Sequence, residues 1–154
     1  MARIEPGYYR FCSEWLLPAR PTAVYRTVVD LASYPDWWPD VRAVSKVDED
    51  TAELRCRAVL PYSLQLRMHR REQDEHSGRL RVELSGDLIG LLAGDISAVP
   101  QGTRLVIIQE VIVAKRILRL LDPVARPVFR ANHAMMMRHG HEGLRRRLRV
   151  TAAP

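Results

Sequence analysis

Apolar and polar residues alternate along the middle of the chain, from Val41 to Ala114. This period-two pattern, interrupted by turn residues at short intervals, is typical of antiparallel strands with one face in water and one in the protein interior. The turn signals are Asp48-Glu-Asp, Leu60-Pro-Tyr, Glu75-His-Ser-Gly, Gly86-Asp and Pro100-Gln-Gly. They predict six antiparallel strands in one continuous meander.

The predicted strands have a dry face and a wet face. Their apolar sets are Leu54, Cys56, Ala58 and Leu60, then Tyr62, Leu64, Leu66 and Met68, and then Leu80, Val82 and Leu84. The last strand, Thr103 to Ala114, is apolar on both faces except at Gln109 and Glu110. This predicts either cover on both sides or an end that packs beneath helices.

One strand and two short helices are predicted before the meander. The strand, about Tyr8 to Leu17, has Tyr9, Phe11, Trp15 and Leu17 on one side and Arg10 and Glu14 on the other. A helix opens at Pro21, because proline is favoured in the first turn and Val24 and Val28 follow at helical spacing. The second short helix is expected from Ser33 to Trp37, with Pro39 beyond its end.

After the meander we expect a short helix around Arg116 to Leu121 and a long helix from about Val124 or Pro127 to Arg149. The long helix must lie across the dry face of the sheet, since nothing else in the chain is large enough to bury that face. Its predicted apolar stripe is Val128, Phe129, Ala131 or Asn132, Met135, Met136, Gly140, Gly143, Leu144 and Leu148. The fold class is therefore α+β, in a single domain over residues 1–154.

The chain carries a net charge of +6, which raises the question of a nucleic-acid or anionic-membrane partner. Nearly all of the positive charge is arginine spread along the chain, and the one run, Arg145 to Arg149, ends the long helix, where cations complement the helix dipole. Neither a signal peptide nor an apolar run long enough for a bilayer is visible, so we expect a cytoplasmic protein without integral membrane association. Cys12 and Cys56 are read as free thiols.

Three segments resemble the START-like (SRPBCC) superfamily, which includes the polyketide cyclase/dehydrase and lipid transport family and Bet v 1-like proteins. They are Leu17-Pro-Ala-Arg-Pro-Thr-Ala-Val-Tyr, Val29-Asp-Leu-Ala-Ser-Tyr-Pro-Asp-Trp-Trp-Pro-Asp-Val, and Arg130-Ala-Asn-His-Ala-Met-Met-Met-Arg-His-Gly-His-Glu-Gly-Leu. The resemblance implies a helix-grip fold over the whole chain: a seven-stranded curved antiparallel sheet that wraps a long C-terminal helix around a cavity. It implies a cavity for an apolar molecule without deciding whether a reaction occurs there.

Polar residues in phase with apolar neighbours are the candidates for a site in such a cavity. His133 and Asn132 interrupt the helix stripe, and a neutral imidazole there could move a proton or could simply be a hydrogen-bonded core residue. On the last strand, whichever of Gln109 and Glu110 points inward is a polar group in an apolar setting; an inward Glu110 would be the second catalytic candidate.

Further cavity candidates are aromatic or apolar. Trp37 and Trp38 could form a lid at the mouth of the cavity or anchor the short helices. The remaining candidates are Tyr62, Leu64, Leu66, Phe129 and Met136. No cofactor or metal site is expected, since His139 and His141 are two residues apart and face different sides of a helix.

Three functions remain open at this point. The first is binding or transport of a small hydrophobic, lipid- or polyketide-like molecule by a monomer or homodimer. The second is an enzyme of the cyclase, aromatase or dehydratase type that uses His133 or Glu110 in the same cavity. The third, less favoured, is an arginine-rich module that binds nucleic acid or the ribosome.

Overall fold

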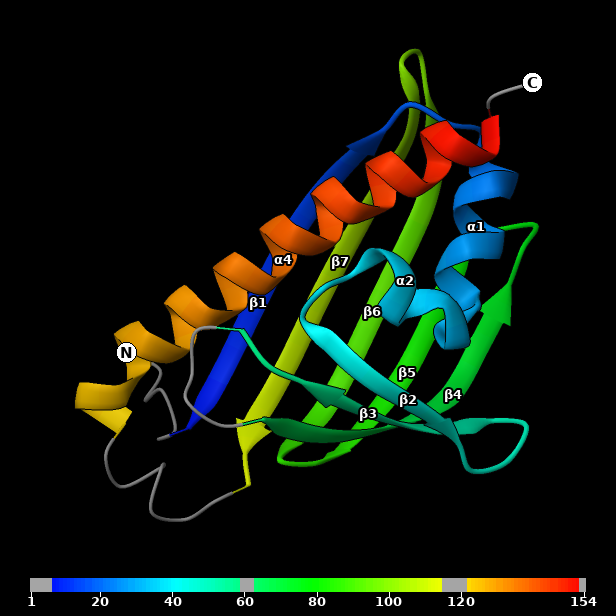
Figure 1. The fold of residues 1–154 in the computed structure, drawn as a ribbon. Helices are drawn as coiled ribbons and strands as arrows, with labels where there is room; N and C mark the ends of the chain where they lie inside the picture. Colours follow the sequence, from blue (N-terminus) through cyan, green and yellow to red (C-terminus); the bar gives the residue numbers. More distant parts are fainter. Residues whose placement is uncertain (1–6, 59–62, 115–121, 153–154) are drawn as a thin grey trace.

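The fold was obtained as a computed structural model, which describes residues 7–58, 63–114 and 122–152 (Figure 1). The first strand, β1 (Tyr8–Leu17), is followed by helix α1 (Pro21–Val29), the 3₁₀ turn η1 (Leu31–Ser33) and the short helix α2 (Tyr34–Trp37). Among the described residues, the elements that follow are β2 (Val41–Lys46), β3 (Thr51–Cys56), β4 (Leu64–Asp74), β5 (Arg79–Gly86), β6 (Leu88–Val99), β7 (Gly102–Val113) and α4 (Asp122–Ala152).

The strands form one sheet in the order β1-β7-β6-β5-β4-β3-β2, with every neighbouring pair antiparallel. Strands β2 to β7 are thus a meander, and β1 joins it beside the last strand. The predicted seven-stranded helix-grip architecture is confirmed. The short helix predicted from Ser33 begins instead at Tyr34, because Leu31–Ser33 form a separate 3₁₀ turn. The helix expected around 116–121 lies outside the described residues.

Helix α4 runs diagonally over one face of the sheet, close to β1 at its amino-terminal end and to α1 at its carboxyl-terminal end (Figure 1). It begins at Asp122, earlier than predicted, so Pro127 falls inside the helix. The predicted stripe is wrong at two positions, since Val128 is 48% and Met135 37% exposed. Each comes one residue before a position that faces the sheet, about 100° away around the helix.

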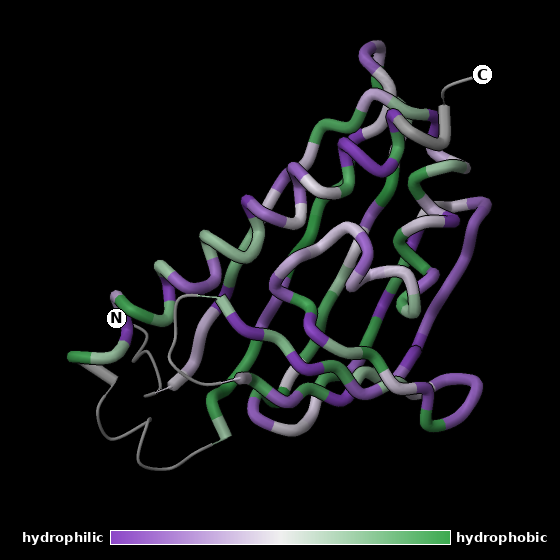
Figure 2. Tube along the Cα trace, viewed as in Figure 1, coloured by the Kyte–Doolittle hydropathy of each residue, from purple (hydrophilic) through white to green (hydrophobic). Residues whose placement is uncertain are grey.

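Several of the most completely buried side chains lie at the end of the sheet where α1 and the last turns of α4 come close together (Figure 1). Leu17, Val24, Leu105, Leu144 and Leu148 are almost completely buried there. The second half of β4, by contrast, is a continuous hydrophilic stretch (Figure 2). Fully buried side chains are therefore concentrated at this end of the molecule, and the cavity described below lies over the remaining inner face of the sheet.

Candidate functional site

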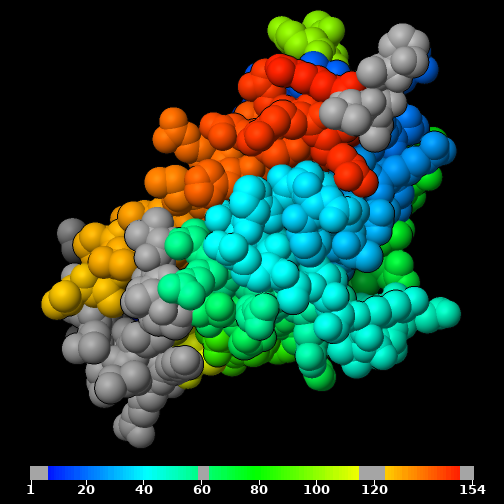
Figure 3. All heavy atoms as spheres, in the orientation of Figure 1, coloured from blue at the N-terminus to red at the C-terminus, as the bar shows by residue number. Residues whose placement is uncertain are grey.

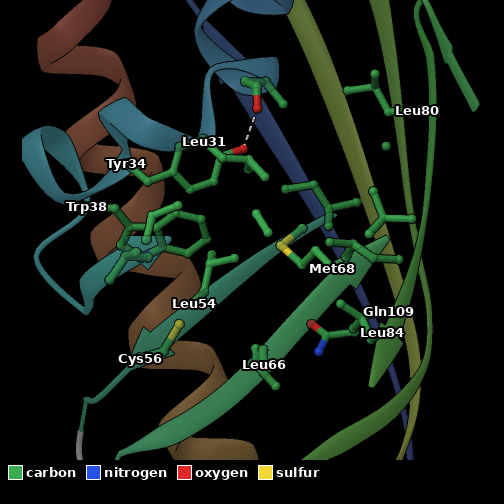
Figure 4. Close-up of a pocket in the computed structure, with 18 of the residues that line it drawn as sticks. Leu31, Tyr34, Trp38, Leu54, Cys56, Leu66, Met68, Leu80, Leu84 and Gln109 are labelled. Atoms are coloured by element: carbon green, nitrogen blue, oxygen red, sulfur yellow. Dashed lines mark hydrogen bonds between the residues drawn. The ribbon is translucent and has the colours of Figure 1, made fainter. Parts of the chain in front are cut away.

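A cavity of about 540 Å³ lies between the inner face of the sheet and the helices α2 and α4. Most of its lining is aliphatic or aromatic, and strands β3 to β7 supply alternate residues to it (Figure 4). Helix α4 and the segment from α1 to β2 cover it in the space-filling view (Figure 3). Its size falls in the range of about 300–1,000 Å³ that is usual for small-molecule sites.

Two adjacent indoles from α2 and the residue after it form one wall of the cavity. The rings of Trp37 and Trp38 stack with centroids 5.6 Å apart, and Trp38 meets Trp15 of β1 edge to face at 5.8 Å. Trp37 Nε1 donates to Ser33 Oγ at 3.3 Å, and Trp38 Nε1 donates to the Met136 carbonyl at 2.9 Å. Both polar tips are satisfied, so these residues fasten α2 to α4 and β1 instead of standing open as a lid.

Two glycines allow α4 to approach this wall. A Cβ at Gly143 would lie 1.7 Å from the Trp37 carbonyl oxygen, and a Cβ at Gly140 would lie 2.6 Å from the Trp38 ring. Only glycine fits at these distances. The predicted stripe included both glycines as positions that face the sheet. Gly143 instead faces Trp37 of α2, and Gly140 faces both Trp38 and Trp15 of β1.

A hydrogen bond also joins α4 to Asp40, the residue before β2. His139 Nδ1 lies 2.9 Å from Oδ2 of Asp40, whose side chain is buried. His141, two residues on, stacks on Trp15 with ring centroids 5.5 Å apart and lies 3.0 Å from the Leu16 carbonyl oxygen. The two histidines therefore face different partners, as predicted. The pairing of His139 with Asp40 was not predicted, because no local pattern connects residues 99 positions apart.

Strand β7 turns Gln109 into the cavity and Glu110 away from it. Gln109 shares the inward phase with Leu105, Ile107 and Val111, and all four line the cavity. The Glu110 side chain is 49% exposed and accepts hydrogen bonds from the Tyr8 hydroxyl at 3.3 Å and Arg10 Nε at 3.4 Å. Glu110 therefore departs from the expectation that it lines the cavity, and it is not placed to act there.

His133 forms part of the cavity wall between β1 and α4. Its ring stacks on Phe11 with centroids 3.7 Å apart and planes 9° apart. Its Nε2 lies 3.2 Å from Gln109 Oε1. Burial lowers the pKa of His133 to about 4, so the imidazole is neutral at neutral pH. Because the facing Gln109 atom is an amide oxygen, which can only accept, this pairing requires the tautomer that carries its proton on Nε2.

Two further polar groups of the lining are the hydroxyl of Tyr34 and the thiol of Cys56. The Tyr34 hydroxyl donates to the Val28 carbonyl at 2.5 Å, drawn as the dashed line in Figure 4, and burial raises its pKa. Burial also raises the pKa of the Cys56 thiol to about 12, so this cysteine stays protonated and is a poor nucleophile.

Charged residues line the cavity only where the chain is exposed to solvent or half-buried, within the described residues. They come from the end of α1, the β2–β3 turn and the second half of β4: Asp30, Lys46, Asp48, Glu49, Asp50, Arg70 and Glu72. Arg70 pairs with Asp50 across this group. We call these seven residues the charged rim; they form the more exposed part of the lining, and the aliphatic and aromatic residues form the rest.

Nine of the predicted cavity residues line the cavity. They are Trp37, Trp38, Leu64, Leu66, Gln109, Phe129, Asn132, His133 and Met136. Tyr62 lies outside the described residues. The prediction missed the contribution of β1, where Tyr9, Phe11 and Trp15 line the cavity; their alternation had predicted a buried face, and pairing with β7 brings that face to the cavity.

The described residues were also compared with what a metal site, a membrane span or a nucleic-acid surface requires. Among residues 7–58, 63–114 and 122–152, no three His, Cys, Asp or Glu side chains form a group suited to a metal ion. No helix in this described part has both the length and the apolar character of a bilayer span. Arg145, Arg146 and Arg149 are exposed on the last turns of α4 and do not line the cavity.

Comparison with known proteins adds a family and a set of folds. The sequence model of the family "Polyketide cyclase / dehydrase and lipid transport" matches residues 17–139. No curated protein sequence gives a significant match.

Three solved structures illustrate the fold. TTHA0849 from Thermus thermophilus superposes with a TM-score of 0.72 at 18% identity, over 95% of this chain and 99% of that one. The ZhuI aromatase/cyclase from Streptomyces sp. R1128 gives 0.70 at 14% identity, over 96% and 98%. A START superfamily protein from Mycobacterium smegmatis gives 0.68 at 18% identity, over 94% and 99%. At such identities the likeness is one of fold.

Proposed function

Because the chain belongs to the polyketide cyclase/dehydrase and lipid transport family, we propose that it binds a small hydrophobic molecule in the cavity between the sheet and α4. The observation that carries this proposal is an internal space of about 540 Å³ with a mainly apolar lining. Protein interiors are ordinarily packed with few voids larger than a water molecule, and an empty space of this size costs stability because its lining lacks contacts. A hydrophobic ligand would recover that contact area.

Titration with N-phenyl-1-naphthylamine, a neutral apolar probe, tests the proposal by isothermal titration calorimetry. We expect saturable binding of one probe per chain. Val82→Phe places a larger side chain in the cavity lining, and we expect it to weaken binding at least about tenfold while the protein stays folded, because the added ring occupies ligand space.

Ile89→Ser is the matched control, since Ile89 is 52% exposed and does not line the cavity. Binding should be unchanged in this variant. Loss of binding in Ile89→Ser with retention in Val82→Phe would place the probe on the outer face of the sheet and would contradict the proposal.

A second candidate function is proton transfer on a bound polyketide-like substrate. The neutral imidazole of His133, held against Phe11 and Gln109 in the cavity wall, favours it. A synthetic poly-β-keto thioester would then cyclise faster with the protein than without it, and His133→Phe would abolish that acceleration while substrate affinity is kept. Glu110→Gln should leave it unchanged, because Glu110 lies outside the cavity. Equal rates with and without protein would eliminate this candidate.

A further inference from the structure

The polar groups of the cavity are unevenly distributed. Within the described residues, every charged side chain of the lining belongs to the exposed or half-buried rim defined above. Among the buried polar side chains of the lining, the Tyr34 and Thr51 hydroxyls are paired with the Val28 carbonyl and His69. Gln109, His133 and the neighbouring Asn132 form a separate polar group where β7 meets α4. Figure 4 shows Gln109 directed into the cavity from β7.

The hydrogen bond between these elements fixes which polar atoms face the ligand space. The Gln109 atom that faces His133 Nε2, at 3.2 Å, is Oε1, which can only accept, so the neutral ring donates from Nε2. A primary amide has two N–H donors on its nitrogen in addition to its oxygen. Among the residues that the structure describes, no hydrogen bond is made by the Gln109 amide nitrogen, which leaves a donor in an apolar space.

We propose that the cavity selects neutral ligands that bear a carbonyl oxygen, and that Gln109 is the specificity-determining residue that donates a hydrogen bond to that oxygen. This inference rests on the proposed binding function. It goes further by naming the chemical class of the ligand and the residue that recognises it.

Two physical arguments support the selection. A ligand carboxylate beside Gln109 would be buried with no cation among the described deep lining residues, and burial of an unpaired charge is strongly unfavourable. A pure hydrocarbon that displaced water from beside Gln109 would leave the amide donor without a partner, which costs about as much as a lost hydrogen bond. A neutral carbonyl group avoids both costs.

Three probes of similar shape separate these cases: 2-acetonaphthone, 2-isopropylnaphthalene and 2-naphthoate. At about pH 7.5 they present a neutral carbonyl, a hydrocarbon and a carboxylate on the same ring system. We expect 2-naphthoate to bind at least about tenfold more weakly than 2-acetonaphthone by calorimetry. The ratio of the isopropylnaphthalene Kd to the acetonaphthone Kd should fall about five- to tenfold in Gln109→Leu, which removes the donor at similar volume.

Ile108→Leu, next to Gln109 on β7 with a side chain that does not line the cavity, is the matched control and should leave that ratio unchanged. Gln109→Met serves as a second variant that keeps the unbranched side chain, and far-ultraviolet circular dichroism verifies that each variant folds. A ratio unaffected by both Gln109 variants, or naphthoate binding as tight as that of the ketone, would overturn the inference while leaving the cavity as a binding site. Absence of binding by all three probes would contradict the binding function as well.

Discussion

At the scale of single residues, His133 shows how the fold sets the chemistry of a side chain. An exposed histidine is about half charged near pH 6.5. Here the ring is buried against Phe11 and its Nε2–H is used by Gln109, and burial lowers the pKa to about 4. The folded protein therefore holds this imidazole neutral in a range where the unfolded chain would protonate it.

This difference makes stability depend on pH. Between about pH 6.5 and pH 4 the unfolded state binds a proton at His133 that the folded state does not, so the free energy of unfolding falls as the pH falls through this window. The loss between pH 7 and pH 5 should be about 1–2 kcal/mol from this group. His133→Phe keeps a ring against Phe11 and removes the titration.

Urea denaturation of both proteins at neutral pH and at about pH 5 measures the effect. The variant should lose less stability than the wild type on acidification, and the other histidines, present in both proteins, cancel in the comparison. An equal loss in the two proteins would show that His133 titrates alike in the folded and unfolded states.

Gln109 and Glu110 mark the limit of residue-level prediction. Alternation along β7 is plain, but both of its faces are apolar, so the pattern cannot say which face is inside. The pairing with β1 decides it, because Phe11 lies opposite Gln109 and Arg10 opposite Glu110. Cross-strand partners share a face, and the clear alternation of β1 would have assigned both residues had that register been known.

At the scale of elements, α4 is fixed most firmly where it meets α2. Gly140 and Gly143 bring the helix against the tryptophan pair, Trp38 donates to the Met136 carbonyl, and His139 pairs with Asp40. Earlier in the helix, Phe129, His133 and Met136 face the cavity instead. One helix thus combines an anchored segment with a segment that forms the cavity wall.

Gly143→Ala tests the contact between α4 and α2, because here we expect a glycine-to-alanine change in a helix to lower stability instead of raising it. In an exposed helix position alanine is about 1 kcal/mol more stable than glycine. At Gly143 the added methyl group would overlap the Trp37 carbonyl, so we expect a loss of about 2–4 kcal/mol in the free energy of unfolding.

Ala131→Gly, at an exposed position of the same helix, supplies the comparison. It should cost only about 1 kcal/mol, the difference in helix propensity. Both variants are measured by chemical denaturation, and a Gly143→Ala protein as stable as the wild type would show that α2 can move away from α4 at little cost.

Most elements were predictable because period-two and helical patterns are local properties of the chain. Strand β1 and the inward sets of β3 to β5 follow them directly. The sequence pattern placed Gly140 and Gly143 on the inward face of α4. It could not identify the residues that pack against them, because glycine has no side chain whose character would indicate its partner.

At the scale of the whole molecule, the inner face of the sheet is divided between close packing and open space. Leu17, Leu144 and Leu148 are fully buried at one end and do not line the cavity, which occupies the space between the inner face of the sheet and the helices α2 and α4. The order of elements predicted this architecture, because a curved meander and one long helix can bury a common face in few ways. The volume left between them depends on side-chain sizes and curvature together, which no local pattern specifies.

The three tryptophans of the chain, Trp15, Trp37 and Trp38, all lie in the wall of the cavity. Almost all of the near-ultraviolet emission of the protein therefore originates within a few ångströms of the place where a ligand would sit. A ligand that entered the cavity would change the surroundings of all three indoles, so the intrinsic tryptophan fluorescence would report its binding directly.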